Sequence, residues 1–187
     1  LSRSEYGKII EDKKIIECRS LLFKYREKRV HPQLDDKILT DWNGLMISAF
    51  ARSARALDDK MYLQVAEKAA NFCISQLQEQ NGKLLKRWRK GKAGLSAHLE
   101  DYAFLIQGLI DLYEAGFKTK YLKSALELTD LTIKLFEDEE KGGFFFTADD
   151  GEQLLVRPKE IYDGAIPSGN SVMAINLARL SKMTNNA

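Results

Sequence analysis

The sequence predicts an all-α protein of about three αα-hairpins, and three observations support this fold class. Apolar residues recur at helical spacing in six segments of the chain. These segments alternate between a one-faced apolar pattern and a pattern that is apolar on nearly all sides. The two patterns also repeat along the chain. Outer and inner helices in alternation are typical of an arc of an (α/α) toroid, or alternatively of a short α-solenoid.

The composition indicates one globular domain over residues 1–187. Of the 187 residues, 44% are apolar and 30% are charged, as in soluble proteins. The formal net charge of +2 is too small to indicate a nucleic-acid partner. Because no apolar run could span a bilayer and no signal peptide is recognisable, we expect a cytoplasmic protein with no membrane partner. The chain begins with Leu1 rather than Met, and we expect it to be part of a longer protein.

Cys18 and Cys73 are the only cysteines, and both lie among apolar residues of helical segments. Neither belongs to a C-x-x-C motif. We therefore expect two buried, reduced thiols rather than a disulfide.

The first unit opens with a long outer helix over residues 2–29, whose apolar residues line one side among many Lys, Arg and Glu. Pro32 ends it, because the residue before a proline is disfavoured in helical geometry. A polar loop over 33–41 follows. Residues 42–57 are then apolar on most sides and rich in small residues, which predicts a fully buried inner helix.

The second unit repeats this order. Residues 60–78 predict a one-faced outer helix, which Asn81-Gly82 ends in a turn. Residues 83–97 are expected to be a short extended or looped excursion. The second inner helix is expected over 98–116.

The third unit has its outer helix over residues 118–136. After Gly142-Gly143, two apolar runs flank the turn at Asp149-Asp150-Gly151, which is typical of a small β-hairpin near 144–156. A polar loop then leads into the third inner helix, over 168–183.

Matching residues support the repeat. At an offset of 59, Tyr62, Leu63, Ala66 and Ile74 correspond to Tyr121, Leu122, Ala125 and Ile133. At an offset of 127, Asn43, Met46, Ala51 and Arg52 correspond to Asn170, Met173, Ala178 and Arg179.

Each loop that leads into an inner helix carries acidic residues. In a toroid these loops line one mouth of the central cavity, where one carboxyl group can donate a proton while another acts as base or nucleophile. Capping of helix N-termini is the alternative role for each acid. The acids are Asp35, Asp36 and Asp41, then Glu100 and Asp101, then Glu160 and Asp163.

His98 opens the second inner helix beside two acids, and it would titrate near neutral pH. Catalysis and a hydrogen-bonded structural role are both open for it. The basic segment 83–92 surrounds Trp88, and we expect a solvated hairpin there rather than a nucleic-acid site. No residues are spaced like a metal site or a phosphate-binding glycine loop, so we expect no metal and no cofactor.

Three motifs stand at the starts of the inner helices. They read DDKILT-x-WNGLM from Asp35, LEDYAFL from Leu99 and RPKEIYDGAIPSGNS from Arg157. In this order they resemble the signatures of the thioredoxin-domain-containing family of the spermatogenesis-associated thioredoxin-like type. The resemblance implies a six-hairpin, glycosidase-like (α/α)₆ toroid, of which this chain holds about three hairpins. It also implies a thioredoxin-like domain in the full-length protein, which this chain lacks.

On this basis we expect part of a carbohydrate-binding or carbohydrate-active domain of the epimerase, isomerase or glycosidase-like kind, with a small-molecule sugar as ligand. The catalytic candidates are Asp36, Asp101, Glu160 and Asp163. Candidates for contacts to the sugar are Trp42, Tyr102 and Tyr162 by stacking, and Asn43, Arg157 and Asn170 by hydrogen bonding.

The alternative is a non-catalytic helical scaffold or a partner-binding module beside the thioredoxin-like domain. Because half a toroid would leave apolar surface uncovered, we also expect the chain to self-associate.

Overall fold

The computed structural model of the protein describes residues 12–151 and 155–185. They fall into two compact units, one ending at Asp35 and the other beginning at Asp36. The first unit contains helix α2 (Lys13–Arg26), whose first turn is capped by the carboxylate of Asp12. Of the outer helix expected over 2–29, the described part is thus shorter at its carboxyl end, and residues 2–11 lie outside the described residues.

The second unit is mostly helical, which confirms the predicted fold class. Its helices are α3 (Thr40–Leu57), α4 (Lys60–Gln76), α5 (Leu99–Gly116), α6 (Thr119–Phe136) and α7 (Gly169–Thr184). Its three short strands are β1 (Ile38–Leu39), β2 (Leu85–Arg89) and β3 (Lys92–Ser96), which form an antiparallel sheet in the order β1-β2-β3.

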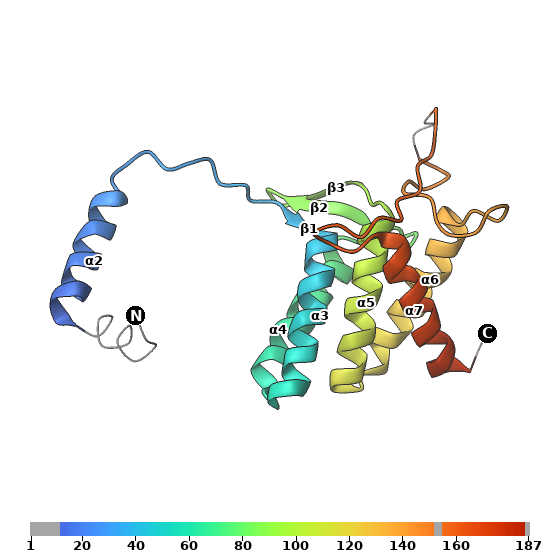
Figure 1. Cartoon of the computed structure of the whole chain (residues 1–187), viewed down its shortest axis with the longest axis horizontal. Coiled ribbons are helices and arrows are strands. Elements are labelled where there is room, and N and C mark those ends of the chain that lie inside the picture. The colour runs from blue at the N-terminus through green and yellow to red at the C-terminus, as the bar shows by residue number, and fades with distance from the viewer. Residues whose placement is uncertain (1–11, 152–154, 186–187) are drawn as a thin grey trace. The chain divides into compact units, whose positions relative to one another are not determined.

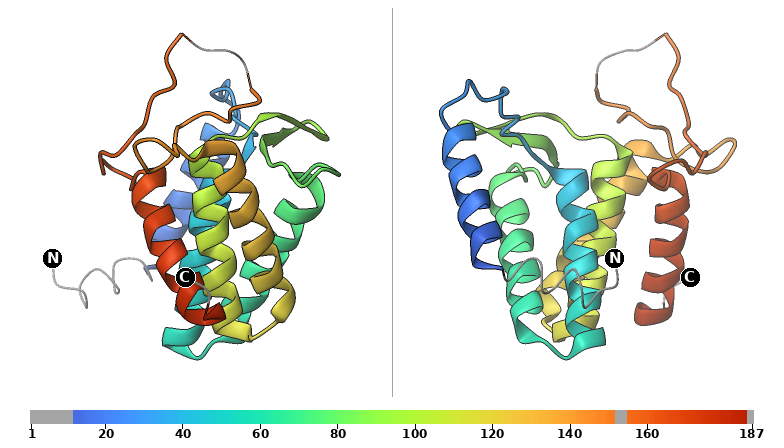
Figure 2. Two further views of the ribbon diagram at one scale, coloured as in Figure 1. Left: turned by 90° about the vertical axis from the view of Figure 1, so that its right-hand side faces the viewer. Right: turned by 60° about the vertical axis from the view of Figure 1, so that its left-hand side comes forward.

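The helices of the second unit form two layers. The predicted inner helices α3, α5 and α7 lie side by side with α5 in the middle, and α4 and α6 pack behind them (Figures 1 and 2). The sheet lies across the N-terminal ends of α3 and α5 (Figure 1). The loops that lead into the inner helices therefore gather at one end of the helical layers.

Glycine contacts bring α3 and α5 unusually close. A Cβ atom on Gly44 would lie 2.4 Å from the carbonyl carbon of Phe104, and one on Gly108 would lie 2.7 Å from the carbonyl oxygen of Gly44. Real Cβ atoms do not approach backbone this closely, so only glycine permits this helix crossing.

The β-hairpin stands elsewhere than expected. Among the described residues of 144–156 no strand forms, because backbone groups of the Phe run bond to other elements: the N–H of Phe145 donates to the carbonyl of Phe136, and the N–H of Phe146 to that of Pro158. The hairpin of the structure is β2–β3, which overlaps the basic segment 83–92 where a solvated hairpin was expected and extends to Ser96. Lys90 and Gly91 form its two-residue turn with positive φ angles of 49° and 77°.

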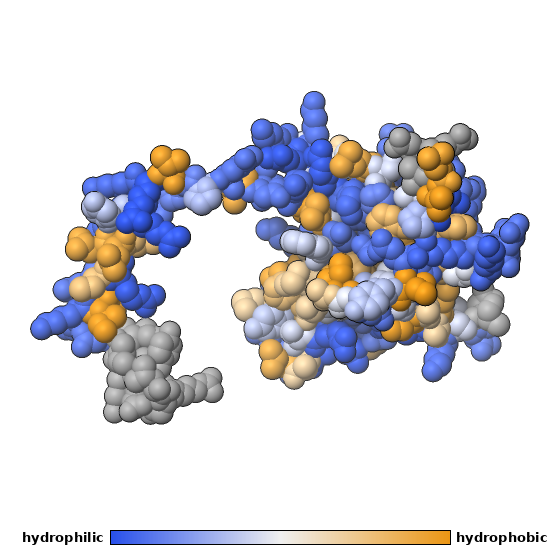
Figure 3. Space-filling model, turned by 45° about the horizontal axis from the view of Figure 1, so that its top comes forward, coloured by the Kyte–Doolittle hydropathy of each residue, from blue (hydrophilic) through white to orange (hydrophobic). Residues whose placement is uncertain are grey.

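Burial of the inner helices is uneven. Helix α5 has neighbours on several sides, and twelve of its residues are buried. Helix α3 was expected to be buried on all sides, but Trp42, Met46 and Leu57 are exposed within the described residues. Its face away from α4 and α5 has no neighbouring helix in this unit, and apolar side chains reach the surface among hydrophilic ones (Figure 3).

Both described cysteines are free thiols. Cys73 is buried as expected, and burial raises its pKa to about 12, whereas Cys18 is exposed on α2. In the part of the chain that the structure describes, no helix is long and apolar enough to cross a membrane.

Candidate functional site

The start of α5 is organised by the carboxylate of Asp101, which is fully buried. Its Oδ2 accepts a hydrogen bond from the backbone N–H of His98, the residue that precedes the helix, at 2.8 Å. Its Oδ1 accepts from the backbone N–H of Asp41 in α3 at 3.2 Å. One carboxylate thus satisfies amide donors at the starts of two neighbouring helices.

Lys86 of strand β2 links the same two helices. Its Nζ lies 3.2 Å from Oδ2 of Asp101 and 3.3 Å from Oδ2 of Asp41. Along a strand, alternate residues point to one face, so Lys86 shares the helix-facing side of the sheet with Trp88, whose ring contacts Phe72. We call Asp41, Lys86, His98 and Asp101 the mouth cluster.

The electrostatics of this cluster differ between its members. Burial raises the pKa of Asp101 to about 6, although the ammonium of Lys86 acts in the opposite direction. Burial alone would lower the pKa of Lys86, but its two carboxylate partners outweigh this and the pKa is raised. Lys86 forms ion pairs with two carboxylates and is partly exposed, whereas Asp101 is fully buried and is paired with one cation. The positive charge is therefore held more firmly than the negative charge of Asp101.

His98 and Lys86 line a cavity of about 410 Å³ between β3 and the loop after Phe146. The imidazole stacks on the ring of Phe146, with centroids 4.6 Å apart. Among the described residues, Nδ1 of His98 has no hydrogen-bond partner. Burial, and then the charge of Lys86, lower the pKa of His98, so its ring is mainly neutral at pH 7. The other residues that line the cavity are Leu95, Ser96, Ala97, Thr147, Ala148 and Gly151.

Glu100 is the second acid at the start of α5. Burial raises its pKa, and repulsion from Glu160 adds to the effect. The carboxyl group of Glu100 therefore keeps its proton to a higher pH than an ordinary glutamate does.

The structure does not bring Asp36 and Asp163 into the mouth cluster. Asp36 forms an exposed ion pair with Arg89 at 2.5 Å, and this hydrogen bond lowers its pKa. Asp163 accepts a hydrogen bond from the N–H of Ser168 at 2.8 Å, which lowers its pKa. Of the four acids expected to be catalytic, Asp101 lies within the mouth cluster and Glu160 interacts with Glu100 beside it.

Three of the residues expected to contact the sugar instead donate hydrogen bonds to backbone carbonyls within the fold. The side-chain amide of Asn170 donates to the carbonyls of Phe144 and Glu160, both at 2.9 Å. Arg157 donates to the carbonyl of Thr147 at 2.6 Å, with its guanidinium over the ring of Phe145. Asn43 donates to the carbonyl of Leu39 at 2.7 Å.

The expected aromatic contacts divide into two kinds. The ring of Tyr102 is buried, and its hydroxyl oxygen accepts a hydrogen bond from the N–H of Leu84 at 2.9 Å. Burial raises its pKa to about 12. Its position is that of a core residue rather than a stacking surface. Trp42 and Tyr162 are 62% and 84% exposed, so both rings are open to a ligand.

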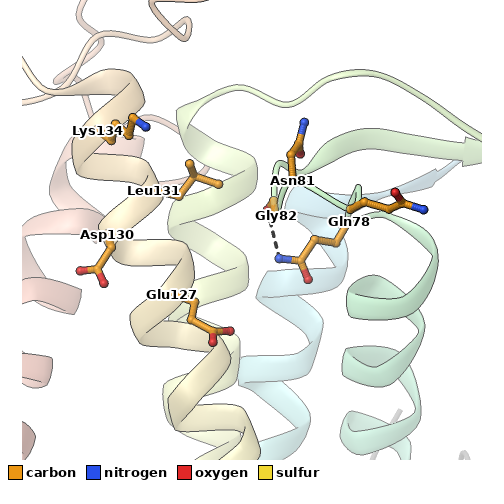
Figure 4. Close-up of a pocket in the computed structure, with 8 residues that line it drawn as sticks. Gln78, Asn81, Gly82, Glu127, Asp130, Leu131 and Lys134 are labelled. Carbon is orange, nitrogen blue, oxygen red and sulfur yellow. Dashed lines mark hydrogen bonds between the residues drawn. The ribbon is translucent and has the colours of Figure 1, made fainter.

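A second hollow, of about 450 Å³, lies between α6 and the turn after α4 (Figure 4). Gln78 donates to the carbonyl of Gly82 at 3.0 Å, and Asp130 points away from this turn. Its polar side chains do not converge on one point, so this hollow is the weaker candidate for a site.

Sequence reasoning did not select Lys86 as a site residue. Its two partners are 15 and 45 residues away in sequence, so no local spacing indicates them. The available signal is the alternation in 85–89, which places Lys86 on the same side of a strand as the apolar Trp88.

The arrangement of the helices matches a known fold. Solved structures similar to this chain are those of (α/α)₆ glycosidase-like proteins, which confirms that the chain is part of such a fold. The cellobiose 2-epimerase of Bacillus thermoamylovorans B4167 has a TM-score of 0.64 and 21% identity, over 81% of this chain and 42% of that one. A family 105 glycoside hydrolase of C. acetobutylicum ATCC 824 has a TM-score of 0.64 and 16% identity, over 97% of this chain and 54% of that one.

Relatives in sequence include proteins named spermatogenesis-associated protein 20. The human protein is 40% identical over 173 residues, which are 87% of this chain and 22% of the relative. The rat protein is 38% identical over 196 residues, which are 98% of this chain and 25% of the relative. The chain thus spans about a quarter of the length of the curated relatives it matches, and it matches no family model.

Proposed function

We propose that the chain forms part of a carbohydrate-active domain in which the mouth cluster and Glu100 act on a bound sugar by acid/base chemistry. The observation that carries this proposal is the cavity of about 410 Å³ in which a neutral His98 ring and the Lys86 ammonium meet beside a buried carboxylate. Structurally similar proteins include a cellobiose 2-epimerase, a D-mannose isomerase and glycoside hydrolases, which supports a sugar as the ligand.

His98 is the proposed general base. His98 lines the cavity, and its mainly neutral imidazole can accept a proton from a ligand there. Glu100 is the proposed proton donor, because burial and Glu160 raise its pKa. Lys86 binds hydroxyl or carbonyl oxygens of the sugar. Asp101 positions Lys86 and the start of α5.

The exposed rings of Trp42 and Tyr162 are the proposed stacking surfaces for the sugar. The exposed carboxylates of Asp36 and Asp163 are assigned no proton transfer, since Arg89 and the Ser168 amide already hold them. Asn43, Tyr102, Arg157 and Asn170 support the loops and the core around the site.

The proposal is tested by thermal unfolding of the chain with a panel of neutral mono- and disaccharides, followed by NMR detection of sugar conversion. A ligand at 100 times its Kd should stabilise the chain by about 2.7 kcal/mol. His98→Gln should lower the rate of conversion by about 100-fold or more. His31→Gln is the matched control, because His31 lies in the first unit and is exposed.

The proposal fails if no sugar raises the unfolding temperature and His98→Gln changes nothing beyond stability. Such a result would favour a non-catalytic helical scaffold.

We further propose, from the three motifs at the helix starts, that the chain functions beside a thioredoxin-like domain. We also propose a cytoplasmic location, since the sequence has no recognisable signal peptide. By itself it should also self-associate, since Met46, Met61 and Val65 expose apolar surface on α3 and α4. Light scattering that shows a monomer at every concentration would contradict the self-association.

A further inference from the structure

Leu95 has an unusual backbone conformation for its place in a strand. Its φ angle is 63°, in the left-handed region that disfavours residues with a Cβ atom. The turn of the hairpin at Lys90 and Gly91 accounts for the neighbouring positive φ angles, but Leu95 is the fourth of the five residues of β3. The adjacent Gly94 does not have a positive φ, although glycine would adopt one without strain.

This conformation interrupts the ladder between β2 and β3 at one point. Leu85 pairs with Ser96, and Arg87 pairs with Gly94. The register would place Leu95 opposite Lys86, but that pair is missing. The pairing of β2 with β3 is therefore interrupted at Lys86, the lysine of the mouth cluster.

The side chain of Leu95 gains no burial in return for this strain. It is 60% exposed, and it lines the same cavity as Lys86 and His98. Ala97 and Ala148 continue the apolar part of the wall, while Lys86 and His98 supply its polar part. A strained residue with an exposed apolar side chain, next to polar groups in a cavity, is typical of a ligand-binding position.

We infer that Leu95 is a ligand-contacting residue whose isobutyl group packs against the apolar face of a neutral sugar ring, while Lys86 and His98 bind the polar edge. This inference rests on the proposed function. A neutral ring is favoured because the ammonium of Lys86 is already paired with the carboxylates of Asp41 and Asp101, so an additional negative charge would be repelled.

The test compares Leu95→Gly and Leu95→Asn with the unchanged chain. Glycine and asparagine adopt the left-handed conformation more readily than leucine, so both variants should unfold at a temperature equal to or above that of the unchanged chain. Both should bind D-mannose or cellobiose about tenfold more weakly in calorimetric titrations, because the apolar contact is lost. Leu57→Ala, an exposed leucine outside the cavity, is the matched control and should leave the Kd unchanged.

Opposite changes in stability and affinity would support the inference, because a residue needed only for packing would lose both together. A lower unfolding temperature in both variants, or an unchanged Kd, would overturn it while leaving the proposed function intact. Absence of any sugar binding by the unchanged chain would remove the proposed function and this inference with it. Glucuronate that binds as tightly as the neutral sugars would overturn the assignment of a neutral ring.

Discussion

The starts of α5 and α7 are each capped by an aspartate, but one aspartate is buried and the other is exposed. At each, an aspartate accepts a backbone N–H close to the first residue of an inner helix: Asp101 from His98, and Asp163 from Ser168. Asp101 is buried, and its pKa is raised; Asp163 is exposed, and its pKa is lowered. Capping an N-terminus therefore does not fix the charge state of an acid, because the effect of burial on its pKa can outweigh that of its hydrogen bonds.

The two junctions also differ in how closely their helices pack against α5. The contact of α3 with α5 sets glycine against backbone, at Gly44 and Gly108. At the start of α7, a Cβ atom on Gly169 would lie 2.9 Å from the side-chain Cγ of Leu99. The nearest backbone atom to this Cβ is the amide nitrogen of Glu100, at 3.3 Å, so the clash with backbone is milder than at Gly44. The contact between α3 and α5 is therefore the more rigid of the two.

The largest expected effect comes from Gly44→Ala. The new methyl group would force α3 away from α5 and should cost about 3 kcal/mol or more of unfolding free energy. Gly169→Ala should cost about 1 kcal/mol, because Leu99 can move. Gly94→Ala is the control, since nothing lies within 4 Å of its added atom, and it should stay within about 0.5 kcal/mol. Urea unfolding measures all three, and equal losses for Gly44 and Gly169 would remove the distinction in rigidity.

Asp101→Ala is expected to have the next largest effect. It leaves the N–H groups of Asp41 and His98 without their acceptor, and Lys86 with one carboxylate in place of two, at a cost of about 2–3 kcal/mol. Asp163→Ala removes one exposed acceptor and should lower the unfolding temperature less. If the two variants were equally destabilised at pH 7, burial of the Asp101 junction would have no energetic consequence.

The pH dependence of stability should have opposite signs at the two junctions. The folded-state pKa of Asp101, about 6, lies above its ordinary value of 3.8, so the folded chain binds more protons between these values. The contribution of Asp101 to stability is therefore largest below about pH 4 and falls by about 3 kcal/mol as the pH rises through 6. The depressed pKa of Asp163 gives stability that is present above pH 3.8 and is lost as the pH falls.

Denaturant unfolding of the unchanged chain and of each alanine variant from pH 3 to pH 8 isolates these contributions. The stability difference between the unchanged chain and Asp101→Ala should grow as the pH is lowered from 7 to 4. For Asp163→Ala the difference should shrink over the acidic range. Parallel curves for the two variants would contradict the assigned environments.

The helices could be predicted from the sequence because their apolar periodicity reflects burial directly. A hairpin was expected in the basic segment 83–92, but the bounds of β2 and β3 were not, because Lys90-Gly91 is a less familiar hairpin turn than Asn-Gly. The Phe run looked like a strand, but its backbone bonds to α6 and Pro158. Similarly, the acids at the helix starts were visible in the sequence, but their burial was not. The cation that joins Asp41 to Asp101 is Lys86 of β2, and no spacing in the sequence indicated that these three residues meet.

The close contact between α3 and α5 at Gly44 and Gly108 also affects the mouth cluster, although neither glycine belongs to it. Asp41 lies three residues before Gly44, and Asp101 lies seven residues before Gly108, or about 4.5 Å and 10.5 Å along the helices. The helices are rigid over such lengths. The close contact at the two glycines therefore sets the distance between Asp41 and Asp101, which the side chain of Lys86 bridges. Gly44 and Gly108 thus help to set the geometry of the mouth cluster, and a substitution at either would alter that geometry without changing any polar group.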